Sequence, residues 1–306
     1  MRREGARTAR ETALTEGEPR TVWMGTRLKV LVWAAAAFAI AALCCTGPAA
    51  AVGVPVLRVC ADPDNMPFSN DKGEGFENKL AELVADRLGR ELVYTWFPEN
   101  TGYVPNTTGS NACDLVMGYA QGTGLIEDTN PYYFASYVLI TRGEDADLEG
   151  VTSLADPRLT SKRIGLVART PPASILAMHG LIANAKPFDD RSGESPADVA
   201  REMIAAIESG ELDAGLLWGP IGGYYASQSS VPLTVAPLVR ESVGPATFYG
   251  ITLGVRPNEP QFKHRVNKVL AENRTEITAI LQDYDVPVLD REGQLAAAAG
   301  TPPAGR

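Results

Sequence analysis

Apolar residues recur along this chain at two alternating periods, and these predict strands and helices in succession from residue 56 onward. Residues 56–61 (VLRVCA) and 91–97 (ELVYTWF) are short apolar runs typical of strands. The apolar residues of 76–88 recur every 3.6 positions, as on one face of a helix. Gly89 follows where a left-handed cap is expected. Because α/β folds bind ligands at the carboxyl ends of strands, we expect the loop 62–74 to line a binding site.

The same alternation returns further along the chain. Strands are predicted at 114–118, 131–141, 163–168, 213–220, 233–238 and 248–255, and helices at 170–180, 195–210, 258–270 and 275–284. The strand 213–220 is expected to finish in a turn at Gly219 and Pro220, and Asn258 is expected to cap the helix after it. Alternating strands and helices predict two α/β lobes, each a mostly parallel sheet flanked by helices. Two extended strands, 133–141 and 248–255, are expected to join the lobes as a hinge.

These elements divide the chain into five predicted parts. They are a targeting segment (1–51), the first part of lobe 1 (52–142), lobe 2 (143–242), the return to lobe 1 (243–291) and a disordered tail (292–306).

The first 51 residues have the pattern of an export signal. Basic residues precede an apolar run at 30–43, and Ala49-Ala50-Ala51 offers a cleavage site. The run has about 14 residues, whereas a membrane span needs about 20. Met24 is an alternative start. A lipid anchor at the Cys44-Cys45 pair is the less favoured alternative, because a leucine precedes the pair.

Removal of this segment leaves 255 residues with 21 basic and 33 acidic side chains, a net charge of −12. The absence of a basic stripe argues against nucleic acid as a partner. The acidic surface fits a solubility role or attraction of a basic partner. Cys60 and Cys113 remain, and an exported protein can join them as a disulfide. If their strands are parallel neighbours, the two thiols lie toward opposite ends, so a buried free thiol stays an alternative.

Several segments then resemble a known family. The Asp62 loop, the Gly75-Phe76-Glu77 helix start, DLVMG at 114–118 and NPYY at 130–133 resemble the periplasmic solute-binding proteins of ABC transporters, family 3. The resemblance covers roughly 57–288 and implies a two-lobed periplasmic-binding-protein-like fold. Finer segments resemble its quinoprotein-dehydrogenase-associated branch, the MoxJ/XoxJ-type proteins: RVCADPDNMPFSNDKGEGFENKLAELVADRLG (58–89), YTWFPEN (94–100), CDLVMG (113–118), RTPPASILAMHGL (169–181) and LLWGPIGGYYA (216–226).

The branch resemblance implies a non-enzymatic, monomeric binding protein without a cofactor of its own. Its partners would be a PQQ-dependent methanol or alcohol dehydrogenase, which it helps to mature or activate, and that enzyme's cytochrome c. The rival is an ABC-transporter receptor that delivers a small polar solute, such as an amino acid, to a permease. Amino-acid-binding members carry an arginine after the third strand that pairs with the ligand carboxylate. Residues 121–128 (QGTGLIED) hold two acids there instead, which favours the branch function.

Thirteen residues are candidates for the ligand or partner cleft: Asp62, Asn65, Phe68, Glu74, Phe76, Glu77, Tyr103, Gly118, Tyr132, Tyr133, Thr170, Ala173 and Trp218. Phe76 also fits a core position, and Trp218 fits either a cleft wall or a core plug. The helix start at 170–173 offers amides to an anion or carbonyl, although Pro171 and Pro172 remove two donors.

Enzymatic and metal-dependent functions are less well supported by the sequence. Glu74 and Glu77 would be the carboxylates of an enzyme of the dehydratase type. The loop 62–74 lacks the spacing of a calcium-binding EF-hand loop, because Met66 and Pro67 stand where a ligand and the glycine belong. His179 and His264 lie on separate predicted helices without further ligands at zinc spacing.

Overall fold

The structure is a computed structural model that describes residues 53–98, 106–122, 124, 126–189 and 195–297. The predicted targeting segment lies outside these residues. From Val54 onward the chain forms one compact unit. None of the described helices has the length and apolar character that a membrane span requires.

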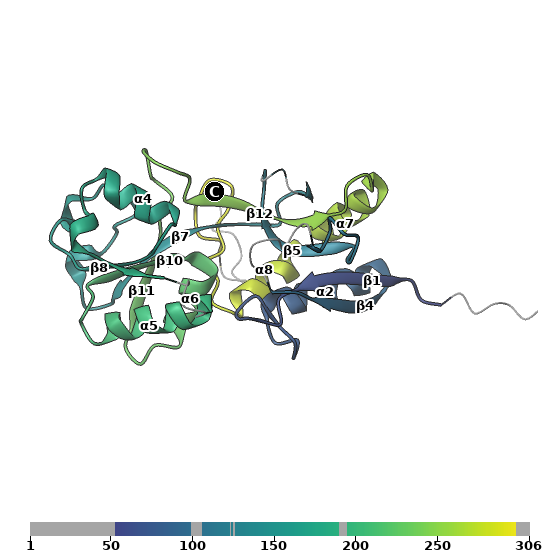
Figure 1. The fold of residues 1–306 in the computed structure, drawn as a ribbon, viewed down its shortest axis with the longest axis horizontal. Helices are drawn as coiled ribbons and strands as arrows, with labels where there is room; N and C mark the ends of the chain where they lie inside the picture. Colours follow the sequence, from purple (N-terminus) through teal and green to yellow (C-terminus); the bar gives the residue numbers. More distant parts are fainter. Residues whose placement is uncertain (1–52, 99–105, 123, 125, 190–194, 298–306) are drawn as a thin grey trace, which may run out of the picture. The chain divides into compact units, whose positions relative to one another are not determined.

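Ten strands of the described chain form one mixed sheet in the order β4-β1-β5-β12-β7-β10-β8-β9, with β6 beside β12 and β11 beside β7 (Figure 1). The strands are β1 (Val56–Ala61), β4 (Glu91–Trp96), β5 (Leu115–Ala120), β6 (Glu127–Asp128), β7 (Tyr133–Arg142), β8 (Ile164–Val167), β9 (Ala185–Phe188), β10 (Ala214–Trp218), β11 (Leu233–Pro237) and β12 (Phe248–Val255). A separate hairpin joins β2 (Asp64–Asn65) to β3 (Ser69–Asn70).

Strand direction divides this sheet into two halves. In the first half β4, β1 and β5 run parallel, and in the second half β10, β8 and β9 run parallel. Between them β12 and β7 pair antiparallel, from Phe248↔Ser136 to Ile251↔Tyr133. The expectation of mostly parallel sheets is therefore right for the outer strands, and the sheet is mixed where the two crossing strands meet. Their action as a hinge and the predicted lobe boundaries remain predictions.

Helices cover both halves of the sheet. They are α2 (Phe76–Leu88), α4 (Pro171–Met178), α5 (Pro196–Glu208), α6 (Gly219–Ser227), α7 (Pro260–Glu272) and α8 (Arg274–Gln282), with short 3-10 turns at Ala146–Leu148, Pro157–Leu159 and Ile182–Asn184. The apolar faces of α2, α7 and α8 pack with β1, β5 and β12 in one core. In the second half α5 and α6 cover one face, and α4 with residues 148–159 covers the other.

The predicted helix 76–88 is confirmed at both ends. Gly89 adopts the left-handed conformation (φ 64°, ψ 39°) that ends α2. At the start of α2, Asn78 completes a capping box with the Gly75 backbone.

Three local predictions need correction. Gly219 and Pro220 do not form a turn but begin α6, because proline is well tolerated in the first turn of a helix. The cap of α7 is Glu259 rather than Asn258, which adopts a left-handed conformation one residue earlier. The chain stays packed beyond Glu292, since the Ala296 amide donates to the Val288 carbonyl at 2.8 Å. Residues 298–306 lie outside the described part of the chain.

Candidate functional site

The loop after β1 is held by hydrogen bonds among its own polar residues. The Asn78 Oδ1 atom, fully buried on α2, accepts from the amides of Asn70 (3.1 Å) and Gly75 (3.0 Å). The Asn70 Oδ1 atom in turn accepts from the Glu74 amide (2.8 Å), and the Asn70 Nδ2 atom donates to the Glu74 carboxylate (2.7 Å). The Asp62 carboxylate accepts from the Asp64 amide (2.9 Å). Most of the polar groups that suggested recognition therefore fix the shape of this loop.

The two phenylalanines of the predicted cleft belong mainly to the core. Phe76 is completely buried, so it is a core residue rather than a lining residue. Phe68 is half-buried, and its ring lies 5.1 Å from the Phe76 ring. Asn65 is half-buried in the same hairpin. Tyr103 lies outside the described residues.

Four other residues predicted for the cleft lie close together: Glu77, Gly118, Tyr132 and Tyr133. Glu77 is buried, and Gly118 has a positive φ of 63°. A Cβ atom at Gly118 would lie 1.9 Å from the Glu77 Oε1 atom, so a larger residue there would have to displace the carboxylate. The Tyr132 and Tyr133 rings lie 4.9 Å apart. Burial raises the pKa of both tyrosines, and the Glu77 carboxylate raises it further. The backbone of Gly118 lies against the Tyr132 hydroxyl and partly offsets this rise in its pKa.

A pocket of about 160 Å³ lies in the second half of the sheet, where β8 and β10 end and α4, α5 and α6 begin. This is the edge at which parallel α/β sheets bind ligands. Its described lining combines two aromatic rings with aliphatic side chains and one hydroxyl: Tyr137, Val167, Thr170, Pro196, Val199, Leu217, Trp218 and Ile221.

Two predicted residues, Thr170 and Trp218, line this pocket. The Thr170 hydroxyl donates to the Val167 carbonyl at 2.7 Å, so it is already satisfied within the chain. The Trp218 ring meets the Tyr137 ring edge-on at 5.2 Å and the Tyr249 ring at 5.9 Å. Burial raises the pKa of Tyr137 to about 12, so its hydroxyl stays neutral at physiological pH. Ala173 is half-buried and packs against the core on the α4 side.

The two halves of the sheet touch through an aromatic contact that the sequence interpretation missed. The Tyr225 hydroxyl of α6 donates to the Met66 carbonyl in the loop after β1, at 3.4 Å. Arg201 lies over the Tyr225 ring at 5.4 Å and donates to its hydroxyl at 3.2 Å. The neighbouring Tyr224 stacks on Tyr284 with ring centroids 6.2 Å apart. The only sequence signal was the Tyr-Tyr pair in LLWGPIGGYYA.

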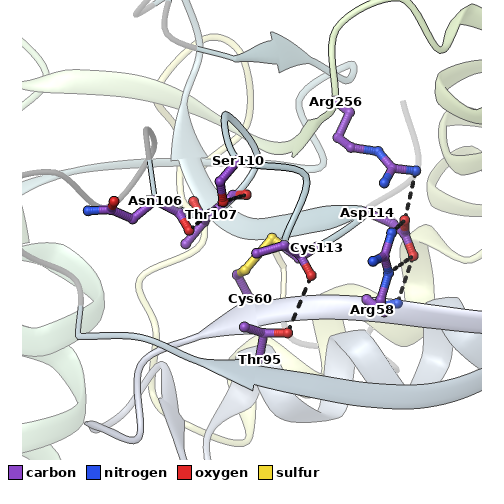
Figure 2. Close-up of a disulfide and its surroundings, with 10 residues drawn as sticks. Arg58, Cys60, Thr95, Asn106, Thr107, Ser110, Cys113, Asp114 and Arg256 are labelled. Carbon is purple, nitrogen blue, oxygen red and sulfur yellow. Dashed lines mark hydrogen bonds and ion pairs between the residues drawn. A yellow bond between two sulfur atoms is a disulfide. The ribbon is translucent and has the colours of Figure 1, made fainter.

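A disulfide joins Cys60 of β1 to Cys113, with Cα atoms 5.6 Å apart (Figure 2). The two strands are parallel neighbours as assumed, but the chain bends on both sides of Cys113 before β5 begins. That bend brings the thiols together, so the concern that they lie too far apart was wrong. Both cysteines are completely buried.

Asp114 lies next to this disulfide and pairs with two arginines (Figure 2). Its carboxylate lies 2.9 Å from Arg58 and 2.8 Å from Arg256. Burial alone would raise the pKa of Asp114. The hydrogen bonds from Arg58 and the charge of Arg256 outweigh burial and lower that pKa below its usual value.

Among the residues that the structure describes, no three His, Cys, Asp or Glu side chains are grouped as a metal site would need. His179 is half-buried and follows the last residue of α4, while His264 is exposed on α7. The geometry therefore offers a small apolar pocket and a buried Glu77–tyrosine cluster, on separate halves of the sheet.

Comparison with known proteins gives a consistent result. The model of a family described as bacterial extracellular solute-binding proteins, family 3, matches residues 57–285. Protein MoxJ of Methylorubrum extorquens is 29% identical over 308 residues, which cover 90% of this chain and 98% of that protein.

Two solved structures extend this likeness to three dimensions. The periplasmic binding protein XoxJ from Methylobacterium extorquens is 40% identical with a TM-score of 0.65, and the match covers 77% of this chain and 100% of that one. MxaJ from Methlophaga aminisulfidivorans is 25% identical with a TM-score of 0.67, over 76% of this chain and 100% of that one. These likenesses agree with the segments that suggested the resemblance.

Proposed function

Since this chain belongs to the bacterial extracellular solute-binding proteins, family 3, and to their MoxJ/XoxJ-type branch, we propose that it assists a PQQ-dependent alcohol dehydrogenase. It acts as an exported, non-enzymatic binding protein that helps this enzyme to mature or become active. The periplasmic-binding-protein-like α/β fold supports a binding role. Export is supported by the family's description as extracellular and by that of XoxJ as a periplasmic binding protein.

The observation that carries this proposal is that the pocket offers no charged side chain to pair with a charged ligand. Among the described residues, no charged side chain lines the pocket at the ends of β8 and β10. A free amino acid carries a carboxylate and an ammonium group, and burying either without a partner costs several kcal/mol. The pocket therefore suits part of a larger partner better than a free amino acid.

The segment expected to supply an arginine in amino-acid receptors has a structural role here. Asp128 lies in β6, which pairs with β12, and the Asp128 carboxylate accepts from the Gly122 amide at 2.7 Å. The Thr252 hydroxyl also lies 3.5 Å from this carboxylate. Two acids in this position would repel a ligand carboxylate, which supports the branch function over amino-acid capture.

The test compares the dehydrogenase made in cells with and without this protein. We expect the enzyme from deletion cells to show lower activity and lower PQQ content per mole of enzyme, and a plasmid copy of the gene to restore both. Retention of the tagged protein on the purified dehydrogenase would report the association directly. Full activity and full PQQ content in its absence would refute the proposal.

The rival function, a solute receptor of an ABC transporter, predicts a different result with the purified protein. A specific ligand at 100 times its Kd stabilises the folded state by about 2.7 kcal/mol. In a domain of 150–250 residues this raises the Tm by roughly 5–10 °C. We expect no shift of this size with any of the twenty amino acids, and such a shift would favour the receptor.

A further inference from the structure

The helices that begin around the apolar pocket share one feature. Helices α4, α5 and α6 all start where β8 and β10 end, and each has proline in its first turn: Pro171 and Pro172, Pro196, and Pro220. The free amides of a helix N-terminus normally make it a site for anions. Proline has no amide hydrogen, so each of these helix starts has lost at least one of the donors that an anion would use.

Further donors and acceptors in and beside the pocket are already used within the chain. At the start of α5 the Ser195 hydroxyl accepts from the Asp198 amide at 3.2 Å, and the Asp198 carboxylate accepts from the Ser195 amide at 3.1 Å. The same carboxylate adds a negative charge at a helix end that would otherwise attract anions. The Thr170 hydroxyl is taken by the Val167 carbonyl. A charged ligand would find few free partners here.

The size and lining of the pocket fit an apolar group instead. Val199, Leu217 and Ile221 supply aliphatic surface, and the Tyr137 and Trp218 rings supply aromatic surface. Trp218 and Ile221 are only half-buried, so an entering group can reach the pocket from solvent. The volume is about 160 Å³. An apolar cavity of about 150 Å³ is large enough to hold benzene.

We propose that this pocket binds one uncharged apolar group, of the size of a benzene ring or a branched aliphatic side chain, and excludes carboxylates. This proposal rests on the proposed function only in one respect, namely where the apolar group comes from in the cell. The same chemistry can arrive as a side chain on an extended segment of the partner enzyme or as a small free hydrophobic molecule. Binding removes the apolar walls of the pocket and the bound group from contact with water, and this burial supplies the driving force.

The experiment uses Trp218 as a local reporter. The chain has tryptophans at 23, 33, 96 and 218, of which the first two lie in the predicted targeting segment, so Trp96→Phe leaves Trp218 alone in the mature protein. We titrate this variant with benzene, with an N-acetylated, C-amidated leucine tripeptide, and with acetate and glycine. Benzene should change the Trp218 fluorescence saturably, whereas acetate and glycine should leave it unchanged. A saturable change with acetate or glycine, or no saturable change with benzene, would overturn the proposal.

The tripeptide arm separates the two sources of the apolar group. A partner side chain and a free hydrophobic molecule both present an uncharged apolar group, so a saturable response to benzene supports the proposal for either source. Stronger binding of the tripeptide than of benzene assigns the group to a peptide segment. Weaker binding assigns it to a free molecule.

A matched pair of variants locates the response. Ile221→Phe fills the pocket and should weaken benzene binding at least ten-fold, whereas Ile182→Phe changes an isoleucine that is exposed and outside the pocket and should alter it less than two-fold. Circular dichroism and the Tm check that both variants fold. If Ile221→Phe does not fold, the titrations of the Trp96→Phe protein still test the proposal. Equal weakening by both variants would overturn the assignment to this pocket.

Failure of this inference and failure of the proposed function give different results. Absence of benzene binding, together with a loss of dehydrogenase activity on deletion, refutes only the pocket. Benzene binding that Ile221→Phe abolishes, together with a fully active dehydrogenase in deletion cells, refutes only the proposed function.

Discussion

The two halves of the sheet present opposite surfaces at the carboxyl ends of their parallel strands. After β1 in the first half, the loop 62–75 is rich in polar groups, but Asn70 and Asn78 use most of them to hold the loop itself. After β8 and β10 in the second half, the corresponding edge is apolar and leaves a pocket of about 160 Å³. The comparison teaches that a polar loop need not be a binding loop, because polar groups that already hydrogen-bond to one another are not available to bind a ligand.

The same contrast extends to what stabilises each half. The first half carries the Cys60–Cys113 disulfide and the buried Asp114 with its two arginines. The pocket edge of the second half has no such covalent link among the described residues, and its walls are single aromatic and aliphatic side chains. Changes in the first half should therefore cost stability, whereas changes at the pocket should cost binding.

The largest effect is expected from loss of the disulfide. Replacing both cysteines by alanine (Cys60→Ala with Cys113→Ala) opens a link between residues 53 positions apart. Loop closure of this length in the unfolded chain is worth about 4 kcal/mol. Urea unfolding of the oxidised wild type and the double variant measures the difference. The double variant should be insensitive to dithiothreitol, whereas the wild type should lose stability in it. Equal stability of both proteins would show that the first half does not depend on this link.

The next effect tests whether the loop after β1 is a scaffold. Asn78→Ala leaves the buried amides of Asn70 and Gly75 without their acceptor, and a buried unsatisfied amide costs about 1–3 kcal/mol. We expect a loss of about 3 kcal/mol in urea unfolding, with the benzene response of Trp218 unchanged. The control Asn184→Ala removes a hydrogen bond from an exposed asparagine to the Thr160 carbonyl and should cost less than about 0.5 kcal/mol. Loss of benzene binding in folded Asn78→Ala would break the comparison, since the loop would then support the pocket.

A smaller effect concerns the acid stability of the first half. Because the pKa of Asp114 is lowered in the folded protein, its ionised form contributes stability above the usual aspartate pKa, near 3.9. That contribution is lost as the pH falls through the lowered pKa. Asp114→Asn should therefore cost about 2 kcal/mol at pH 7, allowing for the partial exposure of Arg58, and the difference from wild type should shrink below about pH 4.

Urea unfolding at pH 7, 5 and 3 measures this dependence. Asp71→Asn, a change at an exposed aspartate, serves as the control and should leave the pH dependence of the wild type intact. A difference between wild type and Asp114→Asn that persists unchanged to pH 3 would mean that the arginine pairing does not set the acid stability.

The periodic elements could be predicted from sequence because their signals are local. The strand Val56–Ala61 matches its predicted bounds because a short apolar run marks it. The helix Phe76–Leu88 matches because its apolar period and the left-handed Gly89 mark it. The start of α6 was missed because a Gly-Pro pair after a strand fits both a turn and a first helical turn. The sequence did not decide whether Cys60 and Cys113 form a disulfide, because the bend at Cys113 depends on packing rather than on spacing.

The candidate site was predictable only where it lies at the carboxyl ends of parallel strands, the edge at which α/β sheets bind ligands. Thr170 follows β8 and Trp218 is the last residue of β10, and both line the pocket there, although their binding role remains a prediction. Tyr137 and Ile221 were missed because their place in the lining depends on how β7 and α6 pack beside β10. The loop after β1 was overvalued because the sequence shows its polar groups but not the hydrogen bonds that they make with one another.

The smallest effect should come from the hydrogen bond between Tyr225 of α6 and Met66 in the loop after β1. Tyr225→Phe removes the hydroxyl that joins Met66 and Arg201 but keeps the ring beneath Arg201. A bond of 3.4 Å is weak, so we expect a loss of only about 0.5–1 kcal/mol in urea unfolding. If the contact also restrains the two halves, amide exchange should speed up at both Met66 and α6. Tyr224→Phe keeps the stack on Tyr284 and is the matched control. Faster exchange confined to α6 would mean that the halves are joined by the central strands β7 and β12 and not by this contact.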